Sequence, residues 1–328
     1  MFRDIQNRIE IPRALKFTAM FMVCAIFANY FAIARAGCTP YYHAATLPQL
    51  LAGTAPSPFQ YRPLFVWFIA AVQHQGWFCE TAERLRDLCY IIELVSCYAL
   101  FAVTWLYLGL FVRSNRIKAV GLLLLMFVLW MTYRVPTQFA FYYIWDIPAA
   151  VFFTLGLYLI HQNRMLAFYA LYAVASLNRE TFAFLTVVYL LVNWHRPKRQ
   201  LIVSCAVQIL IAISVRLLLV TLYGFRPIHH FALLENLGAL PDPYTIGQIL
   251  SALGFLWIFP LLGWHLIPDQ FLKRACLVLP VIAVPAFCMT NVDEIRAYGE
   301  YVGIILPPTL LVLQRIFADA GPQMTTVR

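Results

Sequence analysis

Five arginines in this 328-residue chain stand in short polar or aromatic stretches between long apolar runs. They belong to five different connections and are Arg62, Arg134, Arg179, Arg226 and Arg296. An arginine beside an apolar segment is costly unless it is paired or binds a ligand, and its planar guanidinium suits the oxygens of a phosphate group. Together the five predict a polar cavity that binds phosphate. Taken singly, each could also reach lipid head groups or pair with a nearby carboxylate.

Two carboxylates are candidates for a base that takes a proton from a hydroxyl group. Asp146 follows Tyr143-Ile144-Trp145 and precedes Pro148, at the start of an apolar run. The aromatic neighbours would partly desolvate this carboxylate, as a base that works near neutral pH requires. Asp146 could instead be a plain helix N-cap. Glu180, the substitute candidate, could be no more than the ion-pair partner of Arg179.

Further polar and aromatic residues flank these groups, and we expect them to line the same cavity. They are Tyr61, Trp145, Asn178, His229, His230, Glu294, Tyr298 and Glu300. Adjacent histidines point in different directions on most backbones, so the His229-His230 pair favours a surface or substrate contact over a metal site. The eight cysteines include no CxxC pair, and we expect no metal and no cofactor. Cys38 and Cys79 could pair in an oxidising compartment or stay free.

The elements that position these residues must be membrane-spanning helices. Hydrophobic residues make up 62% of the chain and charged residues 12%, and the mean hydropathy is +0.74. A backbone in hydrocarbon must satisfy its own hydrogen bonds, and strand-like alternation is absent, so the fold class is all-α. The basic pI of about 9.2 comes from short positive clusters between apolar runs, which indicates membrane orientation and no nucleic-acid partner.

The apolar runs predict a polytopic protein of roughly ten spans, forming a single integral membrane domain over residues 1–328. The first run is expected to be retained, because no convincing small-residue cleavage site follows it. The expected spans lie near 15–34, 88–112, 119–133, 143–161, 165–177, 181–194, 201–222, 244–266, 274–289 and 301–316.

The charge distribution predicts which end of the molecule faces the cytoplasm. With both termini placed inside, the connections at 113–118 and 195–200 fall on the cytoplasmic side together with their lysines and arginines. Of the 15 Asp and Glu residues, four fall on that side, namely Asp4, Glu10, Asp269 and Asp319. The candidate site residues therefore gather on the opposite, exterior face.

Two exterior connections are long, at 36–87 and 224–243. The apolar stretch Leu64 to Ala71 in the first is too short to span, so we expect interfacial or re-entrant helices there. The short spans 165–177 and 181–194 meet at a polar break around Asn178-Arg179-Glu180. A break of this kind indicates helices that end in a protein-lined cavity and not in lipid.

This pattern resembles the GT-C superfamily of membrane glycosyltransferases, and the likeness covers most of the chain. The local match is Asp293-Glu294-Ile295-Arg296-Ala297-Tyr298, followed by Leu306-Pro307-Pro308 in the last span. The resemblance implies ten or so helices, a long first exterior loop and a polyprenyl-phosphate-linked sugar as substrate. The family pattern has an Asp or Glu early in that loop, but residues 36–79 contain none. The base would then be Asp146 or Glu180.

The leading hypothesis is transfer of a sugar from a lipid-phosphate carrier to an acceptor on the exterior face, by a multi-pass protein of the bacterial inner (plasma) membrane. Its partners would be membrane lipid and the lipid-linked sugar. A transporter or flippase for an anionic lipid-linked substrate is one alternative, and a non-catalytic membrane subunit is another. A transporter needs polar groups along a whole pathway, whereas Arg216 is the one basic residue placed deep within an expected span. Because the expected site residues lie on one side of the membrane, their distribution favours an enzyme over a transporter.

Overall fold

A computed structural model describes residues 13–76, 81–135, 141–226 and 231–319. Over these ranges the chain is helical and contains no β-strand, as the sequence predicts. One isolated parallel bridge joins Tyr41 to Tyr142 and ties the first long connection to the segment that precedes Asp146. The all-α class is therefore confirmed.

Six helical segments are long and apolar enough to cross a membrane. They are α1 (Arg13–Ala32) with the π-turn η1 (Ile33–Gly37), α4 (Ala82–Leu108), α5 (Asn115–Tyr133), α9 (Lys198–Tyr223), α13 (Gln270–Cys276) with α14 (Val278–Met289), and η6 (Ile295–Tyr301) with α15 (Val302–Asp319). This number of long apolar helices makes the chain an integral membrane protein by composition and length. The number of crossings beyond six stays a prediction.

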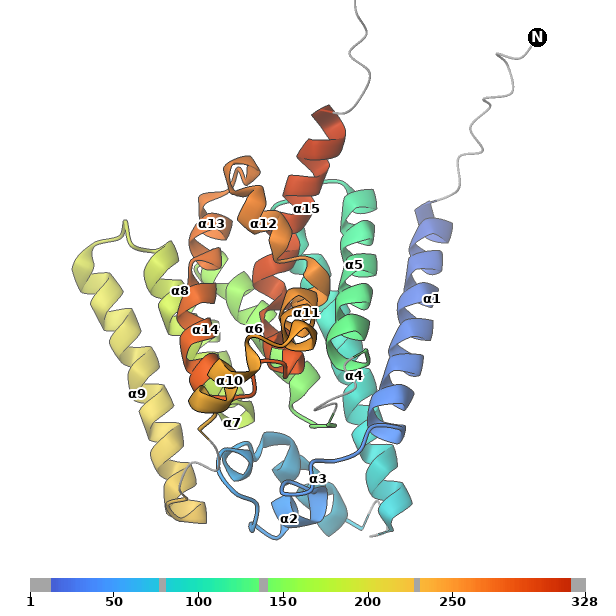
Figure 1. Cartoon of the computed structure of the whole chain (residues 1–328), viewed down its shortest axis with the longest axis vertical. Helices are drawn as coiled ribbons and strands as arrows, with labels where there is room; N and C mark the ends of the chain where they lie inside the picture. The colour runs from blue at the N-terminus through green and yellow to red at the C-terminus, as the bar shows by residue number, and fades with distance from the viewer. Residues whose placement is uncertain (1–12, 77–80, 136–140, 227–230, 320–328) are drawn as a thin grey trace, which may run out of the picture.

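Besides α3 (Leu64–His74) in the first connection, three apolar helices of the described chain are shorter than a membrane is thick. These are α6 (Asp146–His161), α7 (Met165–Asn178) and α8 (Phe184–Val192), the last preceded by η3 (Glu180–Ala183). Helix α6 lies in the middle of the bundle (Figure 1), where it packs against α4, α7, α15 and η6. Because protein surrounds it, α6 can begin at a buried charged residue instead of at a membrane surface.

The segment 244–266 does not form the single helix that we expected. It is divided into α11 (Pro243–Ser251), η4 (Ala252–Phe255), α12 (Ile258–Leu262) and η5 (Trp264–Leu266). The break occurs where Leu253 and Phe255 take positive φ angles of 53° and 63°, on either side of Gly254. A side chain at Gly254 would lie 2.8 Å from the Phe127 ring, so the backbone passes close to α5 here.

The first long connection folds into short helices beneath the bundle, at the end opposite the two described chain ends (Figure 1). They are α2 (Leu47–Leu51), η2 (Phe59–Tyr61) and α3 (Leu64–His74). Leu50 and Ile69 share a buried cluster with Trp145, which anchors the connection under the start of α6. Short helices were expected here, whereas their relation to a membrane surface stays a prediction. The second connection contains α10 (Leu233–Ala239).

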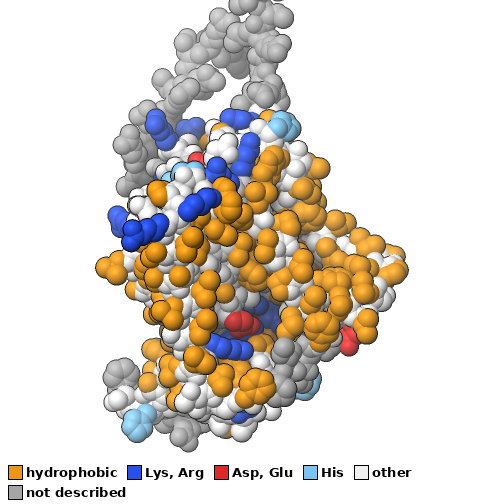
Figure 2. All heavy atoms as spheres, turned by 90° about the vertical axis from the view of Figure 1, so that its left-hand side faces the viewer, with side chains coloured by type: hydrophobic (Ala, Val, Ile, Leu, Met, Phe, Trp, Pro, Cys, Tyr) orange, Lys and Arg blue, Asp and Glu red, His pale blue; other side chains and the backbone are white. Residues whose placement is uncertain are grey.

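The surface divides into chemically distinct zones. Figure 2 shows lysines and arginines gathered toward the upper end of the described residues, above a broad apolar side. Exposed Leu, Ile, Phe and Val side chains on α1 and α9 contribute to the apolar surface. Such a belt with positive charge at one end is typical of a helical membrane protein.

Candidate functional site

A cavity of about 690 Å³ lies between the first connection, the junction of α7 and α8, and helices α9, α10 and α14. Figure 2 shows a hollow in the apolar side of the molecule with acidic and basic side chains inside it. Four arginines line the cavity, namely Arg62, Arg179, Arg216 and Arg296. The volume falls in the range of small-molecule sites. Three of the five arginines that the sequence predicts for a phosphate site are thus brought together.

One wall of the cavity is apolar and comes from a single helix. Ile282, Pro285, Ala286 and Met289 of α14 line it at the spacing of one helical face. The arginines lie on the walls formed by other elements. A ligand with a charged head and an apolar chain could therefore contact both kinds of surface at once.

Arg62 lies at the entry to α3 and is bound to Glu180 at the break between α7 and α8. Its Nε donates to Glu180 Oε2 at 3.0 Å, and its Nη2 donates to Oε1. The guanidinium also lies 5.3 Å from the Trp145 ring centroid. Trp145 is fully buried beneath it. The Glu180 side chain keeps 41% of its surface exposed. This ion pair therefore lies at the cavity wall, where a ligand can compete with Glu180 for Arg62.

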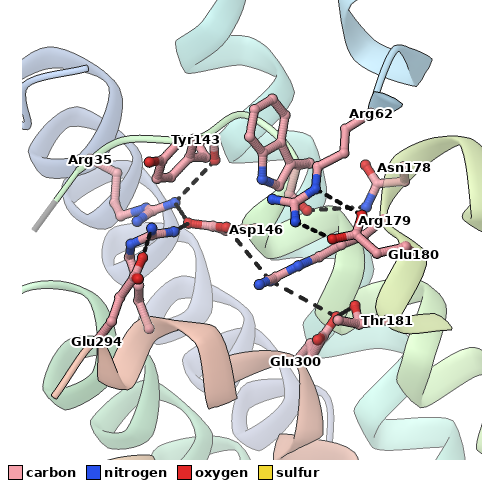
Figure 3. A network of polar contacts seen from close by, with 12 residues as sticks. Arg35, Arg62, Tyr143, Asp146, Asn178, Arg179, Glu180, Thr181, Glu294 and Glu300 are labelled. Carbon is pink, nitrogen blue, oxygen red and sulfur yellow. Dashed lines mark hydrogen bonds and ion pairs between the residues drawn. The ribbon is translucent and has the colours of Figure 1, made fainter. Parts of the chain in front are cut away.

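Asp146 lies behind the cavity wall and not on it. Its side chain is fully buried, and Arg35 donates to its Oδ2 at 3.2 Å. Arg179 Nη1 lies 3.8 Å from Oδ1, and Arg296 Nη1 lies 3.7 Å from Oδ2. Figure 3 shows Asp146 between Arg35 and Arg179. Our expectation that Asp146 faces the cavity is therefore wrong, and it does not cap α6 either. The reason is that three arginines from distant segments surround it.

Arg35 and Glu93 were not among the residues singled out from the sequence. Arg35 Nε donates to Glu93 Oε1 at 2.9 Å, and both side chains are buried. The Arg35 guanidinium also stands 4.5 Å from the Tyr133 ring centroid. Glu93 was detectable, because a carboxylate inside the expected span 88–112 requires a partner. The identity of that partner, 58 residues away, was not readable from spacing.

The break between α7 and α8 places four consecutive polar side chains. Asn178 Nδ2 donates to the carbonyl of Trp145 at 3.1 Å, which joins the end of α7 to the start of α6. Thr181 lines the cavity, and its Oγ1 donates to Glu300 Oε2 at 2.8 Å. Arg179 Nη1 lies 3.9 Å from the same Glu300 oxygen. Glu300 itself is buried behind Thr181.

The segment that carries the family resemblance forms another wall. Glu294 and Arg296 form an ion pair, and both line the cavity with Tyr298. The Arg296 guanidinium stacks over the Tyr143 ring, 4.1 Å from its centroid. Stacking and ion pairing together fix the direction in which this arginine points.

Other candidates from the sequence serve the scaffold. Arg134 donates to Thr39 Oγ1 at 2.9 Å, and Arg226 donates to the carbonyls of Gly53 and Ala55. The Tyr61 hydroxyl donates to the Gly224 carbonyl at 2.7 Å and accepts from the Arg226 backbone N–H. The bonds of Tyr61 and Arg226 fasten the end of α9 to the first connection, and the bond of Arg134 fastens the end of α5 to it. His229, His230 and Cys79 lie outside the described residues, so the expectations for them are not addressed.

Within the described ranges, no group of three or more His, Cys, Asp or Glu residues could hold a metal ion. Comparison of the chain with protein-family models, with curated proteins and with solved structures gives no match. The chemistry of the cavity is therefore the basis for any functional conclusion.

Proposed function

We propose that this protein is a membrane glycosyltransferase that takes a sugar from a polyprenyl-phosphate-type carrier and gives it to an acceptor hydroxyl. The observation that carries the proposal is the cavity lined by Arg62, Arg179 and Arg296 and by the apolar face of α14. A phosphate leaving group needs several donors at once. An isoprenoid chain needs an apolar wall, and the cavity offers both.

Binding would begin at the pair formed by Arg62 and Glu180. The carrier phosphate competes with the Glu180 carboxylate for the guanidinium of Arg62, which offers five N–H donors. Arg179 and Arg296 contribute further positive charge from the cavity wall. Asp146 fixes both of these arginines from behind and so acts as a positioning residue, in place of the base that we expected.

The reaction forms a bond between the acceptor oxygen and the anomeric carbon of the sugar. The bond from that carbon to the phosphate oxygen breaks, and its electron pair stays on the departing polyprenyl phosphate. The proton of the acceptor hydroxyl passes to a protein carboxylate. The arginines stabilise the leaving group most as its charge grows, which is the condition for lowering the barrier.

The cavity also bears on the transporter alternative. A transport pathway would extend toward Asp269 and Lys273 at the other end of the bundle, but neither residue lines the cavity. A buried apolar cluster that includes Leu272, Leu311 and Val312 occupies that end. The polar groups of the cavity lie toward one end of the bundle and the other end is apolar, which favours an enzyme over a transporter.

The proposed topology has ten crossings, with both termini in the cytoplasm of a bacterium and the cavity toward the exterior. It adds α6, α7, α8 and the broken 243–266 segment to the six long apolar segments. The GT-C superfamily is the proposed relationship, because its architecture has a long first exterior loop and a segment that resembles Glu294-Ile295-Arg296-Ala297-Tyr298 before the last span.

The test is a transfer assay in vesicles that contain the purified protein. Synthetic polyprenyl phosphates carrying a hexose or a pentose are supplied with bacterial membrane extract as the source of acceptors, and released polyprenyl phosphate is measured. We expect release by the wild type and a loss of about 10²-fold in the Arg62→Gln variant, since one donor to the developing charge is removed. Arg113→Gln, an exposed arginine at the other end, is the matched control and should match the wild type. No release from any carrier would refute the proposal.

A further inference from the structure

The carboxylates nearest the arginines are already tied to cations. Glu180 accepts two bonds from Arg62, Glu294 is paired with Arg296, and Asp146 has three arginines around it. Protonation of any of these would break an ion pair that the site itself maintains. The acceptor proton needs a different destination.

Glu300 is a buried carboxylate beside the cavity with a long cationic contact. Its side chain is 2% exposed, and Arg179 Nη1 lies 3.9 Å from its Oε2. Arg179 is shared with Asp146, whose Oδ1 lies 3.8 Å from the same nitrogen. Its Oε1 is buried, and the hydroxyl of the neighbouring Tyr301 also interacts with the carboxylate. A buried carboxylate that is only partly neutralised holds a proton more readily than a solvated one.

Thr181 connects this buried carboxylate to the cavity. It lines the cavity from η3, and its Oγ1 donates to Glu300 Oε2 at 2.8 Å. Figure 3 shows the two side chains facing each other next to Arg179. A hydroxyl oxygen donates one hydrogen bond and still accepts others. An acceptor hydroxyl in the cavity can therefore donate to the same Oγ1 that donates to Glu300.

We propose that Thr181 is a catalytic residue and relays the acceptor proton to Glu300, an inference that rests on the proposed glycosyl transfer. The acceptor O–H bond breaks, and its proton passes to Thr181 Oγ1. The original Thr181 proton passes to Glu300 Oε2, so the threonine ends neutral and Glu300 becomes a carboxylic acid. The acceptor oxygen keeps the electron pair and attacks the anomeric carbon, while the leaving phosphate takes the negative charge that Glu300 gives up.

The position of Arg179 fits this transfer of charge. It contacts Glu300 and also lines the cavity where the phosphate would lie. Before the reaction the negative charge is on Glu300, and afterwards it is on the departing phosphate. One guanidinium can stabilise both states with little movement, which is the preorganisation that such a step requires.

The test compares variants at position 181 in the vesicle transfer assay. Thr181→Val keeps the shape but removes the hydroxyl, and we expect transfer to fall by about 10²-fold or more. Thr181→Ser restores the hydroxyl and should retain activity within about fivefold of the wild type. Glu300→Gln should match the valine variant. Binding of farnesyl phosphate, measured by calorimetry, should be unchanged in Thr181→Val, because the loss is in the proton step.

Each outcome separates the relay from the function on which it rests. If the wild type transfers sugar and Thr181→Val does so equally well, the relay is refuted and the glycosyltransferase proposal stands. If serine fails to restore what valine loses, position 181 acts through shape and the relay is again refuted. If the wild type transfers no sugar from any carrier, both proposals fall. If the Thr181→Val protein does not accumulate, Thr181→Ala replaces it as the variant without a hydroxyl and is compared with Thr181→Ser.

Discussion

Arg62 and Glu180 bind each other in the cavity, and a phosphate ligand must separate them. A partly exposed ion pair is worth up to about 1 kcal/mol, so this competition should reduce ligand affinity. We therefore predict that Glu180→Gln binds farnesyl phosphate about two- to fivefold more tightly than the wild type. Arg62→Gln should bind it at least about tenfold more weakly, because charged hydrogen bonds of about 1.5–3 kcal/mol are lost. Isothermal titration calorimetry measures both changes.

The two variants must move in opposite directions for this interpretation to hold. Arg113→Gln is the control for a change in overall charge and should leave the affinity unchanged. Equal weakening by Glu180→Gln and Arg62→Gln would mean that the pair supports the cavity as a unit and does not compete with phosphate.

Asp146 is predicted to matter for stability as well as for positioning. Asp146→Asn leaves Arg35, Arg179 and Arg296 with one counter-charge fewer in a buried site. Removing one member of a buried ion network costs about 3 kcal/mol or more. We expect a clear fall in the melting temperature of the detergent-solubilised protein. Asp87→Asn, an exposed position on α4, is the matched control, and an equal melting temperature for the two variants would contradict the network.

A site residue could be predicted from the sequence where its immediate neighbours indicate its role, and not where its role depends on residues far away in the chain. Arg62, Arg179 and Arg296 interrupt apolar runs, and such interruptions are costly enough to indicate function. Asp146 stands in an equally suggestive stretch, but the stretch does not tell which way the side chain faces. That direction follows from Arg35 and its partners, which lie in other helices. Long-range pairs of this kind cannot be derived from one sequence.

At the scale of elements, η6 carries Arg296 and Glu300 and packs closely against α5 at Gly299. An added Cβ at Gly299 would lie 2.2 Å from the Tyr133 hydroxyl oxygen, inside the buried contact between η6 and α5. We predict that Gly299→Ala destabilises the protein by about 1–3 kcal/mol, as overpacking does, and displaces the walls of the cavity. The melting temperature and farnesyl phosphate affinity should both fall.

Gly247→Ala provides the control for that substitution. Gly247 lies within α11, and an added Cβ there meets no atom within 4 Å. Alanine has the higher helix propensity, so this variant should be neutral or slightly more stable. A Gly299→Ala protein as stable as Gly247→Ala would show that η6 can move without cost.

Helix positions could be predicted where hydropathy alone determines them. They could not be predicted where a change in backbone conformation breaks an apolar segment. The expected span 165–177 corresponds to α7 (Met165–Asn178), and 119–133 falls within α5 (Asn115–Tyr133). The segment 244–266 has the same apolar character but is broken at Leu253 and Phe255. Positive φ angles at two such residues have no local sequence signal. They occur where Gly254 approaches α5 closely.

At the scale of the whole molecule, the proposed orientation places the first connection outside the cell and the start of α9 inside. Thr54 follows α2, Lys198 begins α9, and both are exposed. Figure 1 shows α2 and the start of α9 at opposite ends of the bundle. In a cysteine-free background, we predict that a membrane-impermeant maleimide labels Thr54→Cys in intact cells and labels Lys198→Cys only after lysis. Labelling of position 198 in intact cells would reverse the topology and remove the argument for an exterior active site.

The central claim is that the cavity holds a phosphate on an apolar chain, with the chain against α14. The most direct measurement is photocrosslinking of the purified protein with a polyprenyl phosphate that carries a diazirine in its isoprenoid chain, followed by peptide mapping. The account predicts crosslinks concentrated in residues 278–289 and abolished by excess unlabelled polyprenyl phosphate. Crosslinks spread over the exposed surface of α1 and α9, with none enriched at α14, would contradict it.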